Sequence, residues 1–321
     1  PVLKKTIIDE QAGFRQGRST SDQVLALMTY IENGSQQNQK TGTVFLDLTA
    51  AFDTVWHAGL LLKLSKVLLR WVVEAIELSL HYKRFQVHMS DKNSSWRKQA
   101  NGLPQGSVLS PSLFNIYIND LPATQSRKFI YANDFCLGTQ HRAFDEVKNV
   151  LNKDMDLMVD FLSRWQLQPS ATKSVSSICH LLNAQAKWEL NIYLKGQSIK
   201  HDPNPTYLGV TLDRSLSYHD HLKKTAAKVS SQNNLLSKLA GTSWGARAQT
   251  LKTTALALCY STAEYCAPVW SRSSHTKLVD IQLNTSMCII TGTIRSTPLP
   301  WLSSATYHHH ISDDRRPLQS C

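Results

Sequence analysis

The stretch Lys128-Phe-Ile-Tyr131-Ala-Asn133-Asp134-Phe-Cys-Leu137 holds two short apolar runs on either side of one polar pair, Asn133-Asp134. Asn and Asp both tolerate positive φ angles, so the pair predicts the tip of a tight β-hairpin. An aspartate held at such a tip would project its carboxylate in front of the sheet. Because most Asn-Asp pairs between apolar runs are only turns, the meaning of this hairpin depends on the segments that precede it.

Two segments upstream give the hairpin a chemical context. Val44-Phe-Leu-Asp47-Leu is an apolar strand that ends in an aspartate, and Asn101-Gly-Leu-Pro-Gln105-Gly106-Ser107 is a loop framed by glycines. Nucleotidyl transfer uses two Mg²⁺ ions, which take hard oxygen ligands, usually one or two carboxylates plus substrate phosphates. Asp47 and Asp134 on adjacent strands would supply such a site, although each taken singly is more often a solvated aspartate at a strand end.

The composition describes a basic globular chain that is long enough for two domains. It has 321 residues, of which 42% are hydrophobic, and a formal net charge of +11. This charge suits a polyanionic partner, although many basic proteins have no role with nucleic acids. The six cysteines form no Cys-x-x-Cys pair, which favours buried thiols in a reducing compartment over a zinc module.

Two further features bear on where the protein works. The sequence has no apolar run of about eighteen residues, so no membrane span is expected. The first residues, Pro1-Val-Leu-Lys-Lys, do not form a signal peptide and lack an initiator Met. We therefore expect a fragment of an intracellular protein.

Hydrophobic periodicity predicts alternating helices and strands. The longest amphipathic pattern spans residues 144–165, where apolar residues recur at three- and four-residue steps. Thr20 and Gln23 fit a capping box at the start of another helix. Further segments are predicted as strands at 43–48, 82–89 and 175–182, helices at 60–80 (broken near 69–71) and from 110, a small antiparallel element within 190–212, and helices from 218 to about 287.

Taken in order, these motifs resemble the reverse transcriptase of a non-LTR (LINE-type) retrotransposon, closest to jockey-like or CR1-like elements. The third catalytic motif of that family is an aromatic residue, Ala, Asp and Asp, and it stands here as Tyr131-Ala132-Asn133-Asp134. The resemblance covers about residues 10 to 302. It rests on Gln11–Thr20, Phe45–Val55, Asn101–Pro111, Leu113–Asp120, Tyr131–Asp134, Trp165–Lys173, Tyr207–Asp213 and Glu264–Trp270.

The resemblance implies an α+β fold, in which a right-hand polymerase palm with a small antiparallel sheet backed by helices precedes a mainly helical thumb-like region. It divides the chain into a remnant of the fingers at 1–42, the palm at 43–185, a thumb-like connector and helical region at 186–302, and an irregular tail at 303–321. The implied function is RNA-directed DNA synthesis from an RNA template, a DNA primer and deoxynucleoside triphosphates. The implied location is the nucleus and cytoplasm.

Four positions would carry the chemistry that the resemblance implies. Asp47 would be the first metal-binding carboxylate, and Asn133 and Asp134 occupy the places of the paired catalytic aspartates. Lys173 would approach the pyrophosphate leaving group as a charge stabiliser or proton donor. The implied cofactor is Mg²⁺ in a two-metal site held by Asp47 and Asp134, which is incomplete because Asn133 replaces the bridging aspartate.

Five further positions would bind substrate. By resemblance, Phe52 would be the aromatic gate that rejects a ribose 2′-OH, and Gln105 and Gly106 would lie against the incoming deoxynucleotide and the template. Arg15 and Arg18 stand in a short loop with two glycines, which could hold phosphates. The alternative for this loop is a surface turn that enters a helix.

Lys223, Lys224 and Lys228 stand together near the start of an expected helix. They could contact the phosphate backbone of a duplex, but a solvated helix face explains them about as well. The sequence carries no signal for an oligomeric state.

The chain departs from the family pattern in three places. Asn133 stands for an aspartate, the finger strands that bring an Arg and a Lys to the triphosphate are missing, and the sequence after Trp301-Leu302 resembles an out-of-frame translation. These departures favour a truncated copy with impaired activity. The main alternative is a non-catalytic, nucleic-acid-binding remnant of a degraded element, and a third is a conceptual translation without function.

Overall fold

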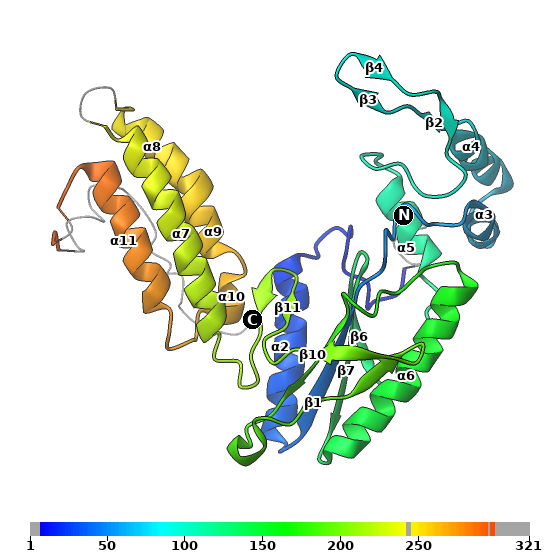
Figure 1. The fold of residues 1–321 in the computed structure, drawn as a ribbon, viewed down its shortest axis with the longest axis horizontal. Coiled ribbons are helices and arrows are strands. Elements are labelled where there is room, and N and C mark those ends of the chain that lie inside the picture. The colour runs from blue at the N-terminus through cyan, green and yellow to red at the C-terminus, as the bar shows by residue number, and fades with distance from the viewer. Residues whose placement is uncertain (1–6, 242–244, 295, 299–321) are drawn as a thin grey trace. The chain divides into compact units, whose positions relative to one another are not determined.

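The computed structural model describes residues 7–241, 245–294 and 296–298, so the tail expected at 303–321 lies outside the described residues. The chain forms two compact units, Pro1–Pro203 and Asn204–Cys321 (Figure 1). Within the described residues, no helix has the length and apolar character that crossing a bilayer requires. The five cysteines in this part of the chain are buried, which agrees with the buried thiols that the sequence predicts.

A six-stranded sheet forms the centre of the first unit. Its order is β6-β7-β1-β8-β10-β9, and all neighbours are antiparallel except β8 and β10. The strands are β1 (Lys40–Leu46), β6 (Arg127–Tyr131), β7 (Asp134–His141), β8 (Val175–Cys179), β9 (Ile192–Leu194) and β10 (Gln197–His201). Residues 192–201 extend the sheet of the first unit, although the expected boundary after residue 185 assigns them to the following region.

Alternation of side chains along β1 gives this sheet two faces with different partners. On one face Thr41 lies beneath α2 (Thr20–Gln36), where a Cβ on Gly34 would come within 2.9 Å of its hydroxyl. On the other face Gly42 lies against α6 (Phe144–Arg164) so closely that a Cβ would come within 2.2 Å of Val147. The amphipathic helix predicted at 144–165 therefore covers the face of the sheet that carries the main hydrophobic core.

The capping box predicted at Thr20 and Gln23 is wrong by one residue. Ser19 has the extended backbone of an N-cap, and its hydroxyl accepts a hydrogen bond from the N–H of Asp22. The carboxylate of Asp22 in turn accepts from the hydroxyl and from the N–H of Ser19, at 2.7 and 2.9 Å. A carboxylate is the better partner here because its negative charge favours a helix N-terminus, and these bonds lower the pKa of Asp22.

Three helices and a ribbon of short strands follow β1. The helices are α3 (His57–Ser65), α4 (Arg70–His81) and α5 (Ser110–Tyr117), and α3 and α4 are separate, as the predicted break near 69–71 requires. The strand predicted at 82–89 is present only as two short pieces of the ribbon. Its strands are β2 (Arg84–Phe85), β3 (His88–Met89), β4 (Lys92–Asn93) and β5 (Arg97–Lys98), of which β2 pairs with β5 and β3 with β4.

The second unit is a helical bundle that follows one small hairpin. Helix α7 packs against α8, α9 and α11. The elements are β11 (Thr206–Tyr207), β12 (Val210–Thr211), α7 (His219–Leu239), α8 (Ala248–Ala255), a π-helical turn (Leu256–Tyr260), α9 (Ser261–Glu264), α10 (Ala267–Trp270) and α11 (Lys277–Thr291). The short 3₁₀ turn at Asn183–Gln185 belongs to the first unit.

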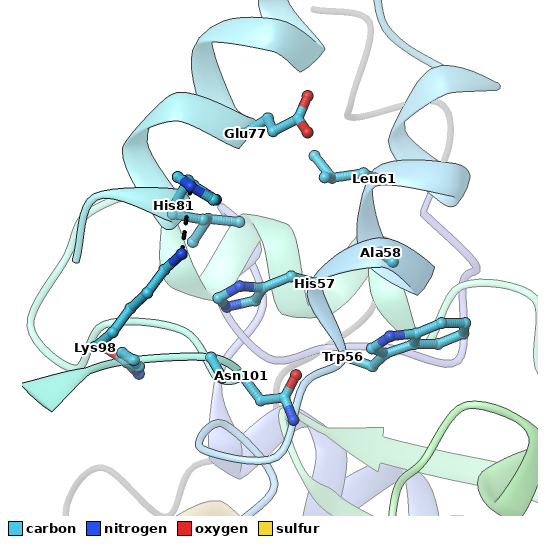
Figure 2. Close-up of a pocket in the computed structure, with 11 residues that line it drawn as sticks. Trp56, His57, Ala58, Leu61, Glu77, His81, Lys98 and Asn101 are labelled. Atoms are coloured by element: carbon cyan, nitrogen blue, oxygen red, sulfur yellow. Dashed lines mark hydrogen bonds between the residues drawn. The ribbon is translucent and has the colours of Figure 1, made fainter. Parts of the chain in front are cut away.

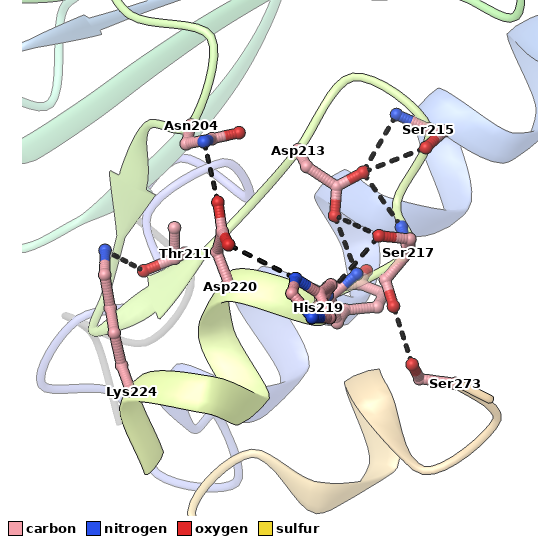
Figure 3. Close-up of polar contacts among 10 residues, drawn as sticks. Asn204, Thr211, Asp213, Ser215, Ser217, His219, Asp220, Lys224 and Ser273 are labelled. Carbon is pink, nitrogen blue, oxygen red and sulfur yellow. Dashed lines mark hydrogen bonds and ion pairs between the residues drawn. The ribbon is translucent and has the colours of Figure 1, made fainter. Parts of the chain in front are cut away.

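Asp213, the last residue of the Tyr207–Asp213 motif, organises the turn before α7 (Figure 3). Its carboxylate accepts the backbone N–H groups of Ser215, Ser217 and Tyr218 at 2.7–3.0 Å. Partial burial acts to raise the pKa of this carboxyl, but the hydrogen bonds outweigh it and hold the pKa below its ordinary value. This aspartate therefore stabilises the start of α7.

Candidate active site

The polar hairpin joins β6 to β7, but its tip lies one residue earlier than predicted. Tyr131 pairs directly with Asp134, so the two-residue turn is Ala132-Asn133 and Asp134 is the first residue of β7. The residue with positive φ is Ala132, at 57°, and not Asn133. Because alanine has no intrinsic preference for that conformation, contacts from elsewhere in the chain must hold it there.

Gln11 supplies those contacts. Its side chain is fully buried, and its Oε1 accepts the N–H of Ala132 at 2.9 Å while its Nε2 donates to the carbonyl of Ala132 at 3.1 Å. The same Oε1 also accepts the N–H of Gly13 at 2.8 Å. A Cβ on Gly13 would lie 2.2 Å from the nitrogen of Ala132, so only glycine permits this approach. No local sequence pattern marks Gln11 as a partner of the hairpin.

Asp47 and Asp134 lie at the same edge of the sheet. The antiparallel register pairs Leu46 with Phe135, so the next step places Asp47 opposite Asp134. Partial burial, followed by the negative charge of Asp47, raises the pKa of Asp134 although that residue is exposed overall. The Oδ2 of Asp47 is buried without a hydrogen-bond partner. The structure therefore brings the two predicted carboxylates together and leaves one oxygen available to a cation.

A short loop fixes Asp47 from the other side and carries Lys173. The N–H of Asp47 donates to the hydroxyl of Ser174 at 3.1 Å, and the N–H of Ser170 donates to the carbonyl of Asp47 at 2.9 Å. Lys173 is the residue before Ser174 and is exposed. In the part of the chain that the structure describes, no carboxylate lies within ion-pair distance of its ammonium group.

Phe52 and Gln105 come from two segments that are bonded to each other. The ring of Phe52 stacks on Phe114 with centroids 4.5 Å apart, and the backbone carbonyl of Phe52 accepts the N–H of Leu103 at 2.7 Å. Gln105 donates from its Nε2 to the carboxylate of Asp53 at 3.1 Å. Gly106 follows with φ of 81°, and a Cβ added there would meet no atom within 4 Å. Phe52 and the Gln105-Gly106 pair therefore belong to one joined surface.

A pocket of about 400 Å³ lies next to the start of the glycine-framed loop, between α3, α4 and residues 98–101 (Figure 2). The Nε2 of His57 lies 2.7 Å from the carbonyl oxygen of Gly102, and the N–H of Gly102 donates to the carbonyl of Val55. Lys98 Nζ lies 3.3 Å from His81 Nε2 across the same pocket. These contacts hold the start of the glycine-framed loop against the segment that carries Phe52.

Arg15 and Arg18 bond chiefly within their own segment. Arg15 donates from Nη1 to the carbonyls of Ile8 and Gln11 at 2.8 and 3.0 Å. Arg18 donates to the carbonyl of Asp9 at 2.9 Å, and both guanidinium groups lie within 4 Å of the Asp9 carboxylate, at 3.7 and 3.4 Å. A phosphate at this loop would therefore compete with an existing acidic partner.

The three lysines of α7 are exposed in the second unit. Lys224 and Lys228, one helical turn apart, line a cavity of about 300 Å³, whereas Lys223 does not. Lys224 donates to the hydroxyl of Thr211 at 3.2 Å. Burial, followed by the positive charge of Lys224, lowers the pKa of the neighbouring His221 to about 4, so this histidine is neutral at pH 7.

Few side chains in the described ranges could complete a metal site. No group of three or more His, Cys, Asp or Glu side chains converges there. The candidate site thus consists of the two carboxylates of Asp47 and Asp134 beside the amide of Asn133. Mg²⁺ is often bound by only one or two protein carboxylates plus substrate phosphates, so this donor set fits the ion while offering it few charges.

Comparison with known proteins shows which family the chain matches. A family described as "Reverse transcriptase (RNA-dependent DNA polymerase)" matches residues 1–212. The "Probable RNA-directed DNA polymerase from transposon BS" of Drosophila melanogaster is 31% identical over 234 residues, which are 70% of this chain and 26% of that protein. The "RNA-directed DNA polymerase from mobile element jockey" of the same species is 26% identical over 251 residues, 75% of this chain and 26% of that protein.

The chain thus spans about a quarter of the length of these curated relatives. Among solved structures, apo telomerase from Candida tropicalis matches with a TM-score of 0.50 and 12% identity, over 94% of this chain and 49% of that one. At this identity the likeness concerns the fold alone. It confirms the α+β, palm-like architecture that the sequence predicts.

Proposed function

The chain belongs to the reverse transcriptase (RNA-dependent DNA polymerase) family, and from this membership we propose that it serves RNA-templated addition of deoxynucleotides to a DNA primer. Its named relatives are polymerases of non-LTR transposons, which fits the resemblance of its motifs to jockey-like elements. The substrates are an RNA template, a DNA primer and deoxynucleoside triphosphates. The reaction class is two-metal nucleotidyl transfer.

The observation that carries this proposal is the pair of carboxylates at one edge of the sheet. Asp47 raises the pKa of Asp134 by its charge, after the larger effect of partial burial, and Asp47 has a buried oxygen without a hydrogen-bond partner. Two neighbouring carboxylates repel each other, whereas a divalent cation is attracted to both of them. Bound there, Mg²⁺ would supply Lewis-acid activation of the primer hydroxyl and charge neutralisation at the phosphates.

The surrounding residues have roles in binding and proton movement. Lys173 is exposed on the loop that fixes Asp47, where its ammonium group can neutralise or protonate the departing pyrophosphate. Phe52 is held by stacking on Phe114, so its rigid ring can exclude a ribose 2′-OH by contact. Gln105 and Gly106 offer an amide and an open backbone to the incoming nucleotide and the template.

Asn133 lowers the expected rate of DNA synthesis by this chain. An amide can offer a cation one neutral carbonyl oxygen, but it removes a full negative charge from the place of the bridging aspartate. Loss of an outer-shell partner already costs a metal site roughly 10–100-fold, and loss of a direct ligand should cost more. We therefore assign this copy impaired synthesis with retained nucleic-acid binding.

Primer extension on an RNA template with Mg²⁺ and deoxynucleotides tests the proposal. The chain as it stands should extend little, and Asn133→Asp should extend faster because it restores a charge at unchanged side-chain size. Since the relatives are longer, the comparison is sharpest in a chain that also carries the upstream segment of an intact relative. If Asp47→Asn leaves the rate of the Asn133→Asp chain unchanged, the paired-carboxylate site is refuted.

A second candidate is a domain that binds primer–template without synthesising DNA. It is favoured because no third His, Cys, Asp or Glu joins Asp47 and Asp134 among the residues that the structure describes. This candidate predicts duplex binding by both chains and no extension by either. Extension by the Asn133→Asp chain would exclude it.

A further inference from the structure

The short strands after α4 form a projecting ribbon (Figure 1). From His81 to Lys98, no side chain is buried. Hydrogen bonds between its two arms hold it together, such as those from the N–H of Ser94 to the carbonyl of Val87 and from the N–H of Gln99 to the carbonyl of Lys83. Its side chains therefore contribute little to folding, and their chemistry is free to serve a partner.

Three large aromatic side chains stand on this ribbon in solvent. Tyr82 is 73% exposed, Phe85 48% and Trp96 65%. Two aliphatic neighbours, Val87 and Met89, are exposed as well. Single exposed apolar residues are ordinary, but several together on one projecting element are typical of an interaction surface.

The same ribbon is strongly basic. It carries five basic residues, Lys83, Arg84, Lys92, Arg97 and Lys98, against a single acidic residue, Asp91. Across the described residues, none of these five cations has a carboxylate within ion-pair distance. The five positive charges therefore favour an anionic partner.

The strand register sharpens this conclusion. Arg84 lies directly opposite Lys98, and like charges in that position destabilise a sheet. Phe85 lies directly opposite Arg97, so an aromatic ring and a guanidinium group share one face. A bound anion would reduce the repulsion between Arg84 and Lys98. At the other pair, a base could stack on Phe85 while an adjacent phosphate contacts Arg97.

We propose that residues 82–98 form a binding arm for single-stranded RNA, with bases stacked on Phe85 and Trp96 and phosphates held by Arg84 and Arg97. Aromatic side chains interleaved with basic ones are the general means of holding an unpaired strand, because each base offers a flat face. A duplex hides those faces within its stack. The choice of RNA rests on the proposed function, whose template is RNA.

Fluorescence anisotropy with a labelled oligouridine tests the arm in the full chain. The double variant Phe85→Ala/Trp96→Ala should bind this RNA about tenfold or more weakly, as expected for lost stacking on two rings. The double variant Arg84→Gln/Arg97→Gln should reduce the slope of log affinity against log salt by about 1.4, two single-strand phosphates. Tyr193→Ala, another exposed aromatic, and Lys153→Gln/Lys200→Gln, which removes equal charge, should bind the RNA like the unaltered chain.

Thermal melting checks that the variants fold, and it should change little because none of the altered side chains is buried. Unchanged RNA binding by both ribbon variants would overturn the proposal. The proposal would also be overturned if the ribbon variants lost as much affinity for a blunt DNA duplex as for the RNA, or if the chain bound oligothymidine more tightly than oligouridine. A change confined to the oligomeric state would overturn it as well. The test is independent of synthesis: failure of Asn133→Asp to extend primers would remove the proposed function, whereas the ribbon is judged by RNA binding alone.

Discussion

At the scale of single residues, the candidate site depends on the distance between two carboxylates. Because the charge of Asp47 helps to raise the pKa of Asp134, Asp47→Asn should lower that pKa. It should stay above the ordinary value of an aspartate, since burial is the larger cause. A ¹³C NMR titration of the aspartate carboxyls measures this, with Asp160→Asn on α6 as the control that should change nothing.

The same shift has a consequence for stability. A carboxyl whose pKa is raised in the folded state binds protons more tightly there than in the unfolded chain, so its contribution to stability increases as the pH falls through that window. Asp47→Asn should weaken this pH dependence. An unchanged pKa of Asp134 in Asp47→Asn would mean that the two groups are too far apart to share a cation.

Gln11 is the residue on which the conformation of the hairpin depends. Gln11→Ala would leave the buried N–H and carbonyl of Ala132 without partners, at roughly 1–3 kcal/mol for each group. Urea denaturation should show this loss, and the amide of Ala132 should exchange its hydrogen faster. Gln36→Ala, at an exposed glutamine of α2, is the matched control. Full protection of the Ala132 amide in Gln11→Ala would show that the turn holds itself.

These residues also show what the sequence could predict. Local patterns predict both carboxylates, because Asp47 ends an apolar strand and Asp134 belongs to a polar pair between two apolar runs. The sequence predicts the tip of the hairpin one residue too late, because intrinsic preference assigns the positive φ to Asn133 whereas the structure assigns it to Ala132. That outcome depends on Gln11, which is 121 residues away in sequence, and no local pattern encodes such a contact.

At the scale of elements, α3, α5 and α6 meet around a buried lysine. The ammonium group of Lys63 donates to the carbonyl of Tyr117 and to Asp120, and it lies 3.5 Å from the ring centroid of Trp165. Burial lowers the pKa of Lys63 to about 8, against the opposing hydrogen bond and charge of Asp120. Since the unfolded chain then binds the proton more tightly, this residue makes stability rise as the pH increases from about 8 to 10.5.

Lys63→Met should abolish that rise. At pH 7 it should change stability little, because it removes the cost of burying the ammonium group together with the bonds to Tyr117 and to Asp120, whose carboxylate is half exposed and stays hydrated. Urea denaturation at several pH values, compared with the control Lys153→Met, measures both effects. Because tyrosines also titrate at high pH, the difference between variant and unaltered chain is the quantity to use. A marked destabilisation at pH 7 would show that the aromatic ring contacts outweigh the burial cost.

Elements differ in how far their sequence determines them. The periodicity of α6 predicts its limits within one residue, because one helix face packs on the sheet over its whole length. The segment 82–89 alternates like a strand, yet its strands are two residues long and unburied, because no layer covers them. At the edge of the first sheet β10 pairs with β8 and β9 pairs with β10, and local composition does not specify these partners.

At the scale of the whole molecule, the net charge of +11 attracts a polyanion over distances longer than those of direct contacts. A particular helix can convert that attraction into contacts with phosphates. Lys224 and Lys228 share a cavity on α7, and Lys223 is exposed beside them. If these lysines only face solvent, they carry the same charges but do not contact the duplex. They then release no counterions from it.

Replacing Lys223, Lys224 and Lys228 together by Ala separates these cases. If all three touch phosphates, the slope of log affinity for a primer–template duplex against log salt should fall by about two to three units. The control replaces Lys153, Lys187 and Lys200, exposed lysines of the first unit, and so removes the same net charge. An equal change of slope in both triple variants would assign the effect to net charge. A change confined to the first variant would place the duplex along α7, because only direct phosphate contacts release counterions at a defined place.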